Sequence, residues 1–299
     1  MVELKKLTTE SRNPKTTDLD QMSPLEIATV MNEEDANVIK AVKDVLPQVA
    51  IAIQWATEAL EADGRIIYIG AGTSGRLGVL DAVECPPTFG VCPERVVGLI
   101  AGGKNAFIKA AEGAEDSLNL CEKELKEISL TADDIVVGLA ASGRTPYVIG
   151  GLRYARSLGC KTIALACNQH SEIGRHADLA IEPTPGPEVL TGSTRLKAGS
   201  TQKMILNMIS TGSMVCTGKA YENLMVDVQQ TNEKLVTRAQ NITMDATGCD
   251  RKTAKKTLAA AGGHAKLAIV MILANCDAQE GRRRLDAAKG HVREAIGQH

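Results

Sequence analysis

Three segments of the sequence combine hydroxyl, guanidinium and backbone groups that could bind an anion. Residues 70–75 read Gly-Ala-Gly-Thr-Ser-Gly and contain Thr73 and Ser74, and residues 140–146 read Ala-Ala-Ser-Gly-Arg-Thr-Pro. Residues 188–203 form the third segment, which is again rich in hydroxyl groups. Each segment precedes a helical pattern, and the free N–H groups and dipole of a helix N-terminus attract negative charge. The three segments together predict a polar pocket for a phosphorylated polyol.

Residues 70–75 also match the G-x-G-x-x-G pattern of dinucleotide-binding folds. That function requires an acidic residue at the end of the second strand to bind a ribose hydroxyl. The second apolar run instead ends Ile-Ala-Gly-Gly at residues 100–103. Residues 140–146 lack the G-x-x-x-x-G-K-[ST] spacing of a nucleotide triphosphate site. We therefore favour a sugar phosphate over a nucleotide.

Charge and composition exclude several classes of partner. The 34 basic and 36 acidic residues leave a net charge of -2, which provides no general attraction for nucleic acid or anionic lipid. Only 2% of residues are aromatic, too few for a binder that stacks nucleobases. The 8 cysteines show neither disulfide density nor metal-ligand spacing, and no apolar stretch approaches the roughly 20 residues of a membrane span. We expect a cytoplasmic protein with no nucleic-acid or membrane partner.

Short apolar runs that alternate with helical patterns indicate the fold class. These runs occupy residues 65–70, 96–101, 135–140, 162–166 and 177–181. They predict an α/β fold of three layers, in which helices flank a parallel sheet of about five strands. Three regions are expected: an N-terminal arm and helices over 1–54, the sugar-phosphate domain over 55–240, and a small helical, UBA-like domain over 241–299.

Local signals predict where several helices begin and end. Ser23, Pro24 and Glu26 form a capping-box pattern after an extended arm, and Pro47 predicts a kink or break in the helical pattern that follows. Long helices are expected over 197–217 and 223–239. Three or four short helices are expected from Asp250 onward.

The three hydroxyl-rich segments resemble the sugar isomerase (SIS) domain superfamily. Within it, the motifs at residues 84–88, 112–116 and 223–228 are similar to those of the N-acetylmuramic acid 6-phosphate etherases, and the similarity extends from about Leu7 to the C-terminus. The resemblance implies cleavage of the D-lactyl ether of that phosphorylated amino sugar by a homodimer, with no cofactor and no metal. One mild departure is Ser200, where a threonine is frequent.

The resemblance also implies which residues act. Glu84 and Glu115 correspond to the catalytic pair. We expect Glu84 at the C-terminal end of a helix, before Pro86, where the dipole favours a protonated acid. We expect Glu115 at the start of a helix, where the dipole favours an ionised base. The expected substrate and phosphate contacts are Thr73, Ser74, Ser142, Gly143, Arg144, Thr145, Ser193 and Lys197.

Two other functions remain open at this point. A non-catalytic sugar-phosphate regulator, such as the related glucokinase regulatory protein, would need the anion pocket but no carboxylate pair. An aldose–ketose isomerase would abstract a proton next to a carbonyl but would have no leaving group to protonate. Without the resemblance, Glu115 would be taken for an ordinary exposed carboxylate, and the role of Glu84 would be undecided.

Overall fold

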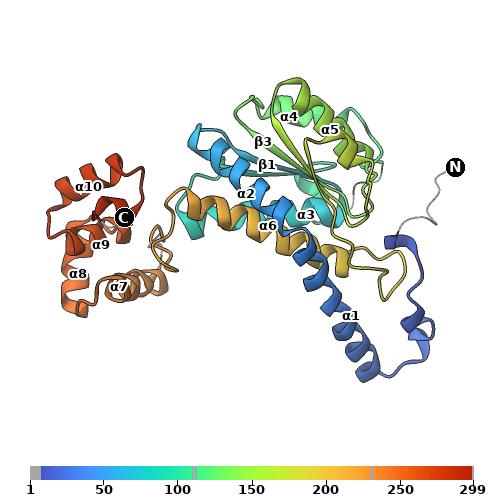
Figure 1. Cartoon of the computed structure of the whole chain (residues 1–299), viewed down its shortest axis with the longest axis horizontal. Coiled ribbons are helices and arrows are strands. Elements are labelled where there is room, and N and C mark those ends of the chain that lie inside the picture. Colours follow the sequence, from blue (N-terminus) through green and yellow to red (C-terminus); the bar gives the residue numbers. More distant parts are fainter. Residues whose placement is uncertain (1–7, 110, 112, 230–231, 298–299) are drawn as a thin grey trace. The chain divides into compact units, whose positions relative to one another are not determined.

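The computed structural model describes residues 8–109, 111, 113–229 and 232–297. It divides into two compact units (Figure 1). The first, here called the α/β unit, comprises the chain up to Val83 together with Glu94–Ser210. The second, here called the helical unit, comprises Glu84–Pro93 and the chain from Thr211 onward.

A five-stranded parallel sheet forms the centre of the α/β unit. Its strands lie in the order β2-β1-β3-β4-β5, and every neighbouring pair is parallel. The bounds are β1 Ile66–Gly70, β2 Val96–Ile100, β3 Ile135–Leu139, β4 Lys161–Leu165 and β5 Leu179–Ile181. The predicted sheet is confirmed. Gly70 pairs with Ile100 on one side and Leu139 on the other, so β1, β2 and β3 end at the same edge of the sheet.

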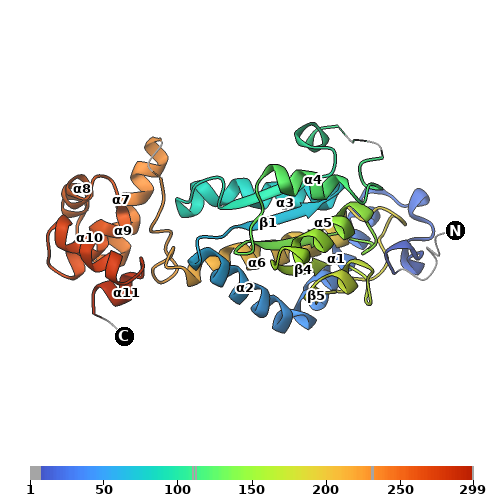
Figure 2. The same ribbon diagram turned by 90° about the horizontal axis from the view of Figure 1, so that it is seen from above.

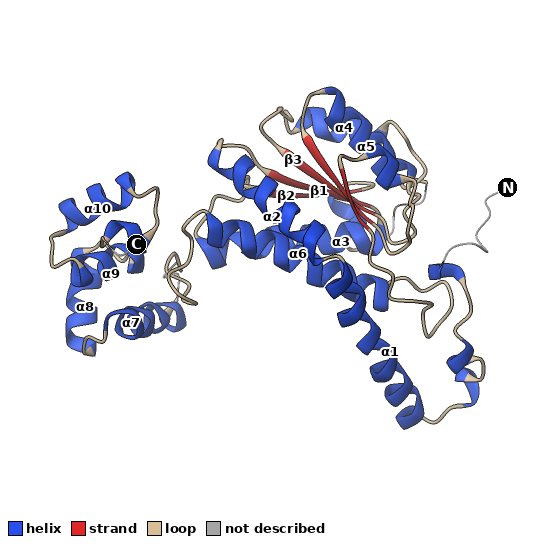
Figure 3. Ribbon diagram, viewed as in Figure 1, coloured by secondary structure: helices blue, strands red, loops and turns tan. Residues whose placement is uncertain are grey.

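Helices cover both faces of the sheet, which completes the predicted three layers (Figures 2 and 3). Helices α4 (Leu120–Glu127) and α5 (Pro146–Ser157) lie on one face, and α2 (Leu46–Glu61), α3 (Gly72–Phe89) and α6 (Lys197–Cys216) lie on the other. Alternate strand residues supply the two cores. For example, Ile69 and Val136 belong to the core under α4 and α5.

The N-terminal helices follow the predicted signals. Helix α1 (Pro24–Asp44) begins with a complete capping box between Ser23 and Glu26. The chain then breaks at Val45, and Pro47 lies in the first turn of α2. The preceding arm is not extended throughout, because residues 8–21 contain the 3-10 turns Thr8–Glu10, Pro14–Thr16 and Leu19–Gln21.

The helix expected over 223–239 is wrong in its first half. Helix α6 ends at Cys216, and α7 spans Glu233–Thr247. Over residues 217–229, between these helices, the chain forms turns and an isolated bridge from Tyr221 to Leu224. Val226 is buried in the core of the helical unit, and its carbonyl accepts a hydrogen bond from the Lys266 N–H at 3.1 Å. This tertiary contact favours a non-helical turn there over local helix propensity.

Four short helices complete the helical unit, as expected from Asp250 onward. They are α8 (Arg251–Ala260), α9 (Ala265–Leu273), α10 (Ala278–Ala287) and α11 (Val292–Ala295). Asp250 and Asp277 cap α8 and α10 with their side chains. The boundary expected at 240/241 falls inside α7, which shares this core. In the described residues no single helix is long and apolar enough to cross a membrane, and the chain bends by 113° between α8 and α9, which reach that length only together.

Candidate active site

The first anion-binding segment forms a tight turn from β1 into α3. A Cβ atom on Gly75 would lie 2.6 Å from the Gly70 carbonyl oxygen, and one on Gly70 would lie 2.8 Å from the Gly75 nitrogen. Glycine is therefore required at both positions for the helix to start directly after the strand. The turn places Thr73 and Ser74 in the first turn of α3, at the carboxyl edge of the sheet.

The start of α6 lies beside this turn. The Ser74 hydroxyl donates to Gln202 Oε1 at 2.9 Å, and both side chains are buried. At Gly199, an added Cβ would contact the Thr73 methyl group at 3.7 Å. The first and third predicted segments therefore meet, through residues on the opening turns of α3 and α6.

The second segment lies against the same end of α6. Ala141 forms a small buried cluster with Cys167 and Ala198, and the Cys167 N–H donates to the Ala141 carbonyl at 2.9 Å. Asn168 Nδ2 donates to the carbonyls of Ala141 and Ser142, at 3.2 and 3.4 Å. Sequence reasoning missed Asn168, although a polar residue soon after the buried strand β4 was a usable signal. All three predicted segments thus converge at one edge of the sheet.

The loop after β3 presents unpaired donors in front of α5. Among the described residues, the N–H groups of Ser142, Arg144 and Thr145 have no hydrogen-bond partner, nor do the Ser142 hydroxyl and the Arg144 guanidinium. Gly143 has a positive φ of 77°, and a Cβ there would lie 2.4 Å from Ser171 Cβ. Glycine thus permits the left-handed turn that brings these donors together. Donors at a helix N-terminus are suited to an oxyanion such as phosphate.

Glu115 lies beside this loop. Its Oε1 accepts a hydrogen bond from Thr145 Oγ1 at 3.1 Å, and its carbonyl accepts one from the Tyr147 N–H at 3.0 Å. The expectation that Glu115 begins a helix is wrong, because it lies in a turn before Leu120, where α4 starts. A helix N-terminus is still present, since Thr145 and Tyr147 belong to the start of α5, whose dipole stabilises negative charge nearby. Glu112, which belongs to the same motif, lies outside the described residues.

Glu84 is exposed on α3, which continues past it. The expected helix end before Pro86 is wrong, since α3 extends through Pro86 and Pro87 to Phe89. The buried side chains of Cys85 and Phe89 explain this continuation, because their packing offsets the two N–H donors that the prolines remove. The negative end of the dipole therefore lies beyond Glu84, which weakens the argument that the dipole alone makes it an acid.

Lys197 is buried in an ion pair rather than presented to a ligand. Its ammonium lies 2.6 Å from Glu34 Oε2, and only 1% of its side chain is exposed. We expected a substrate contact, but the structure gives this residue a partner within the protein. Glu188 precedes α6 in the chain, and its carboxylate lies at the start of that helix. There it accepts hydrogen bonds from the N–H groups of Lys197 and Ala198 at 2.9 and 3.0 Å. Burial raises the pKa of Glu188.

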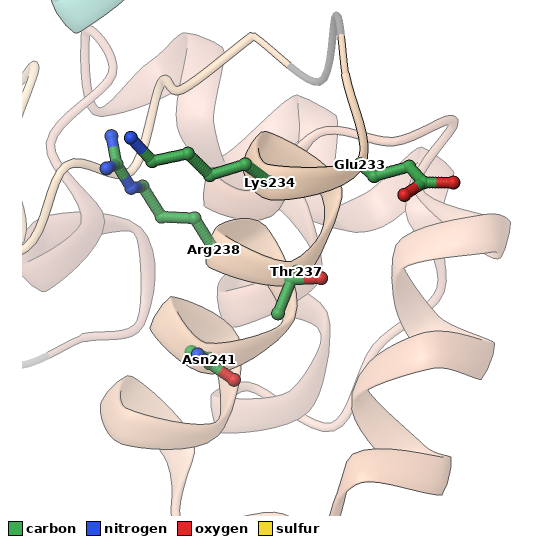
Figure 4. Close-up of a pocket in the computed structure, with 5 residues that line it drawn as sticks. All are labelled: Glu233, Lys234, Thr237, Arg238 and Asn241. Atoms are coloured by element: carbon green, nitrogen blue, oxygen red, sulfur yellow. The ribbon is translucent and has the colours of Figure 1, made fainter.

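Of the other predicted contacts, Thr73 and Ser193 are half-buried, and their hydroxyls make no hydrogen bond in the described part of the chain. A separate hollow in the helical unit lies outside the three segments (Figure 4). There Lys234 and Arg238 point to the same side of α7, and Glu233 points away. None of the predicted site residues lines this hollow.

Comparison with known proteins decides the family. The chain matches the glucokinase regulatory protein N-terminal SIS domain over residues 48–156 and the SIS domain over residues 124–212. It is 57% identical over 273 residues to the N-acetylmuramic acid 6-phosphate etherase of Mycolicibacterium smegmatis, covering 91% of this chain and 92% of that one. It belongs to the N-acetylmuramic acid 6-phosphate etherase family.

The chain is also similar to a second etherase and to a solved structure. The etherase of Oenococcus oeni is 59% identical over 272 residues, covering 91% of this chain and 92% of that one. Among solved structures, a phosphoheptose isomerase from Francisella tularensis is similar with a TM-score of 0.49 and 18% identity, over 65% of this chain and 100% of that one. Membership of the etherase family confirms the resemblance found in the sequence.

Proposed function

We propose that the protein cleaves the D-lactyl ether of N-acetylmuramic acid 6-phosphate, giving N-acetylglucosamine 6-phosphate and D-lactate. One observation carries this proposal: an etherase-family chain holds Glu115 by a hydrogen bond at the edge of a loop of unpaired anion-binding donors. A carboxylate next to a phosphate cradle suits proton transfer on a sugar phosphate.

Elimination followed by addition explains how two carboxyl groups suffice. In the ring-opened sugar, the C2 proton is acidified by the C1 aldehyde, and the lactyl oxygen at C3 is the leaving group. A base removes the C2 proton, the C2–C3 double bond forms, and an acid protonates the departing lactate oxygen. Water then adds at C3 and a proton returns to C2. General acid and base groups typically contribute about 10²–10⁴-fold each.

We assign the base to Glu115 and the acid to Glu84. Glu115 is supported by its place near the N-terminus of α5, which stabilises a negative charge. Glu84 is supported by its motif in the family resemblance. The phosphate is assigned to Ser142, Gly143, Arg144 and Thr145, with Thr73 and Ser193 as further contacts.

A homodimer is proposed as the working form. Helix α1 projects from the α/β unit (Figure 1), and Leu25 and Ile39 on it are 77% and 59% exposed. Burying such side chains against a second copy would gain about 1.5–3 kcal/mol each. We place the enzyme in the cytoplasm, because all 8 cysteines lie in the described residues and none of them forms a disulfide bond.

The deciding experiment is incubation of the purified protein with N-acetylmuramic acid 6-phosphate, followed by assays for D-lactate and for a ketose. Lactate without a ketose is expected. A ketose product would indicate an isomerase, and binding without turnover would indicate a regulator. Turnover in D₂O should place deuterium at C2 of the amino sugar product, whereas direct displacement would leave C2 unlabelled.

Two variants separate the roles of the carboxylates. Glu115→Gln should suppress both C2 exchange and lactate release, because it removes the base. Glu84→Gln should suppress lactate release while C2 exchange survives. If Glu84→Gln abolishes exchange and Glu115→Gln retains it, the two roles are reversed.

A further inference from the structure

Gln202 carries a buried polar group that the fold itself does not use. The residue lies on α6 and is 1% exposed. Its Oε1 accepts the hydrogen bond from Ser74 Oγ at 2.9 Å. Its Nε2, which carries two donors, is buried without a hydrogen-bond partner in the described residues.

Packing alone does not explain a glutamine at this position. A buried donor without an acceptor costs free energy, whereas an apolar side chain of similar length would fill the same space without that cost. Next along α6, Lys203 pairs with Asp81 of α3 at 3.3 Å, so the contact between the two helices has a second polar link. What glutamine adds is the acceptor oxygen opposite Ser74.

That acceptor determines what Ser74 offers to a ligand. A serine hydroxyl has one hydrogen and two acceptor lone pairs. Because the hydrogen of Ser74 is directed at Gln202, the remaining valences of Ser74 Oγ can only accept. A phosphate oxygen in the site would also be an acceptor, and the two would not bond. A sugar hydroxyl or an acetamido N–H, in contrast, is a donor that Ser74 can bind.

We propose that Gln202 is a positioning residue that holds Ser74 as a hydrogen-bond acceptor for a donor group of the substrate's sugar, not for its phosphate. This inference rests on the proposed function for the identity of the sugar phosphate. It divides the site into two parts. The loop of residues 142–145 binds the phosphate. Ser74, held by Gln202, accepts a hydrogen bond from the sugar.

The test uses Gln202→Met, Ser74→Ala and the double variant, with Gln54→Met as a matched control on the exposed face of α2. Gln202→Met should unfold at the same temperature as the parent or higher, because the unpartnered donor is gone. It should nevertheless bind N-acetylglucosamine 6-phosphate about tenfold more weakly by calorimetry, as loss of one hydrogen bond predicts. Ser74→Ala should show a similar loss, and the double variant no further loss.

Inorganic phosphate is the second probe. Its affinity should be unchanged in Gln202→Met and Ser74→Ala. Equal weakening of phosphate and sugar phosphate would overturn the inference, because Ser74 would then be donating to the phosphate. Unchanged sugar-phosphate binding with a lowered unfolding temperature would also overturn it, since Gln202 would then be structural only. Because these readouts are binding measurements, absence of lactate release would refute the proposed function without deciding this inference.

Discussion

Replacing Glu34 by glutamine is expected to destabilise the α/β unit by about 3 kcal/mol. The buried carboxylate accepts hydrogen bonds from Lys197, Asn13 and Lys15 at 2.6, 2.8 and 2.9 Å. Burial by itself would raise the pKa of Glu34, but these three donors outweigh it and lower the pKa from 4.5 to about 2. At about 1.4 kcal/mol per pKa unit, this corresponds to about 3 kcal/mol. Loss of one partner from a buried ion pair costs a similar amount.

The assay is urea-induced unfolding, monitored by circular dichroism. Glu33→Gln is the control, because Glu33 is an exposed neighbour on the same helix, and it should change stability by less than about 0.5 kcal/mol. The pKa of Glu34 is lower in the folded than in the unfolded state, so its contribution is present above about pH 4.5 and is lost as the pH falls toward 2. The difference between the parent and Glu34→Gln should therefore shrink over that range.

Two results would refute this reasoning. One is a Glu34→Gln variant that unfolds at the same urea concentration as the parent at pH 7. The other is a Lys197→Met variant that lowers the free energy of unfolding more than Glu34→Gln does. The Lys197→Met loss should be the smaller one, because Glu34 keeps its hydrogen bonds from Asn13 and Lys15. If Lys197→Met retains full stability but loses affinity for the sugar phosphate, Lys197 contacts the substrate after all.

Three more predictions concern the proposed site and the proposed dimer. Ser142→Ala should weaken binding of inorganic phosphate by about tenfold without lowering the unfolding temperature, because the Ser142 hydroxyl makes no hydrogen bond in the described residues; unchanged binding would mean that this hydroxyl does not bind phosphate. Thr145→Val should lower kcat more than it raises KM, because Glu115 loses the hydroxyl that orients it; an unchanged kcat, measured by lactate release, would contradict this. Light scattering across micromolar concentrations should give twice 31.7 kDa, and a constant monomer mass would exclude the dimer.

Much of the fold could be predicted because its signals are local. The strands are short, β-branched and flanked by turn residues, and the capping box at Ser23 satisfies the helix N-terminus with neighbouring residues. Two of the three helix errors, those at Pro86 and at residues 223–229, have a common cause. At Pro86 the local rule predicts an end, but burial of Phe89 continues α3, and at residues 223–229 burial of Val226 overrides a helical pattern.

By itself, the sequence determined the order of strands and helices and the three segments that could bind phosphate. Hydrophobic periodicity and turn-forming residues depend on neighbours in the chain, so strands, helices and turns can be predicted from the sequence alone. Only the tertiary structure decided what each polar side chain faces. Lys197 belongs to a hydroxyl-rich segment but is paired with Glu34, 163 positions away, while Glu115 meets Thr145 across a separation of 30. The partners of a charged or hydroxyl group come from distant parts of the chain, and burial and hydrogen bonding then determine whether the group stabilises the fold or is available to a substrate.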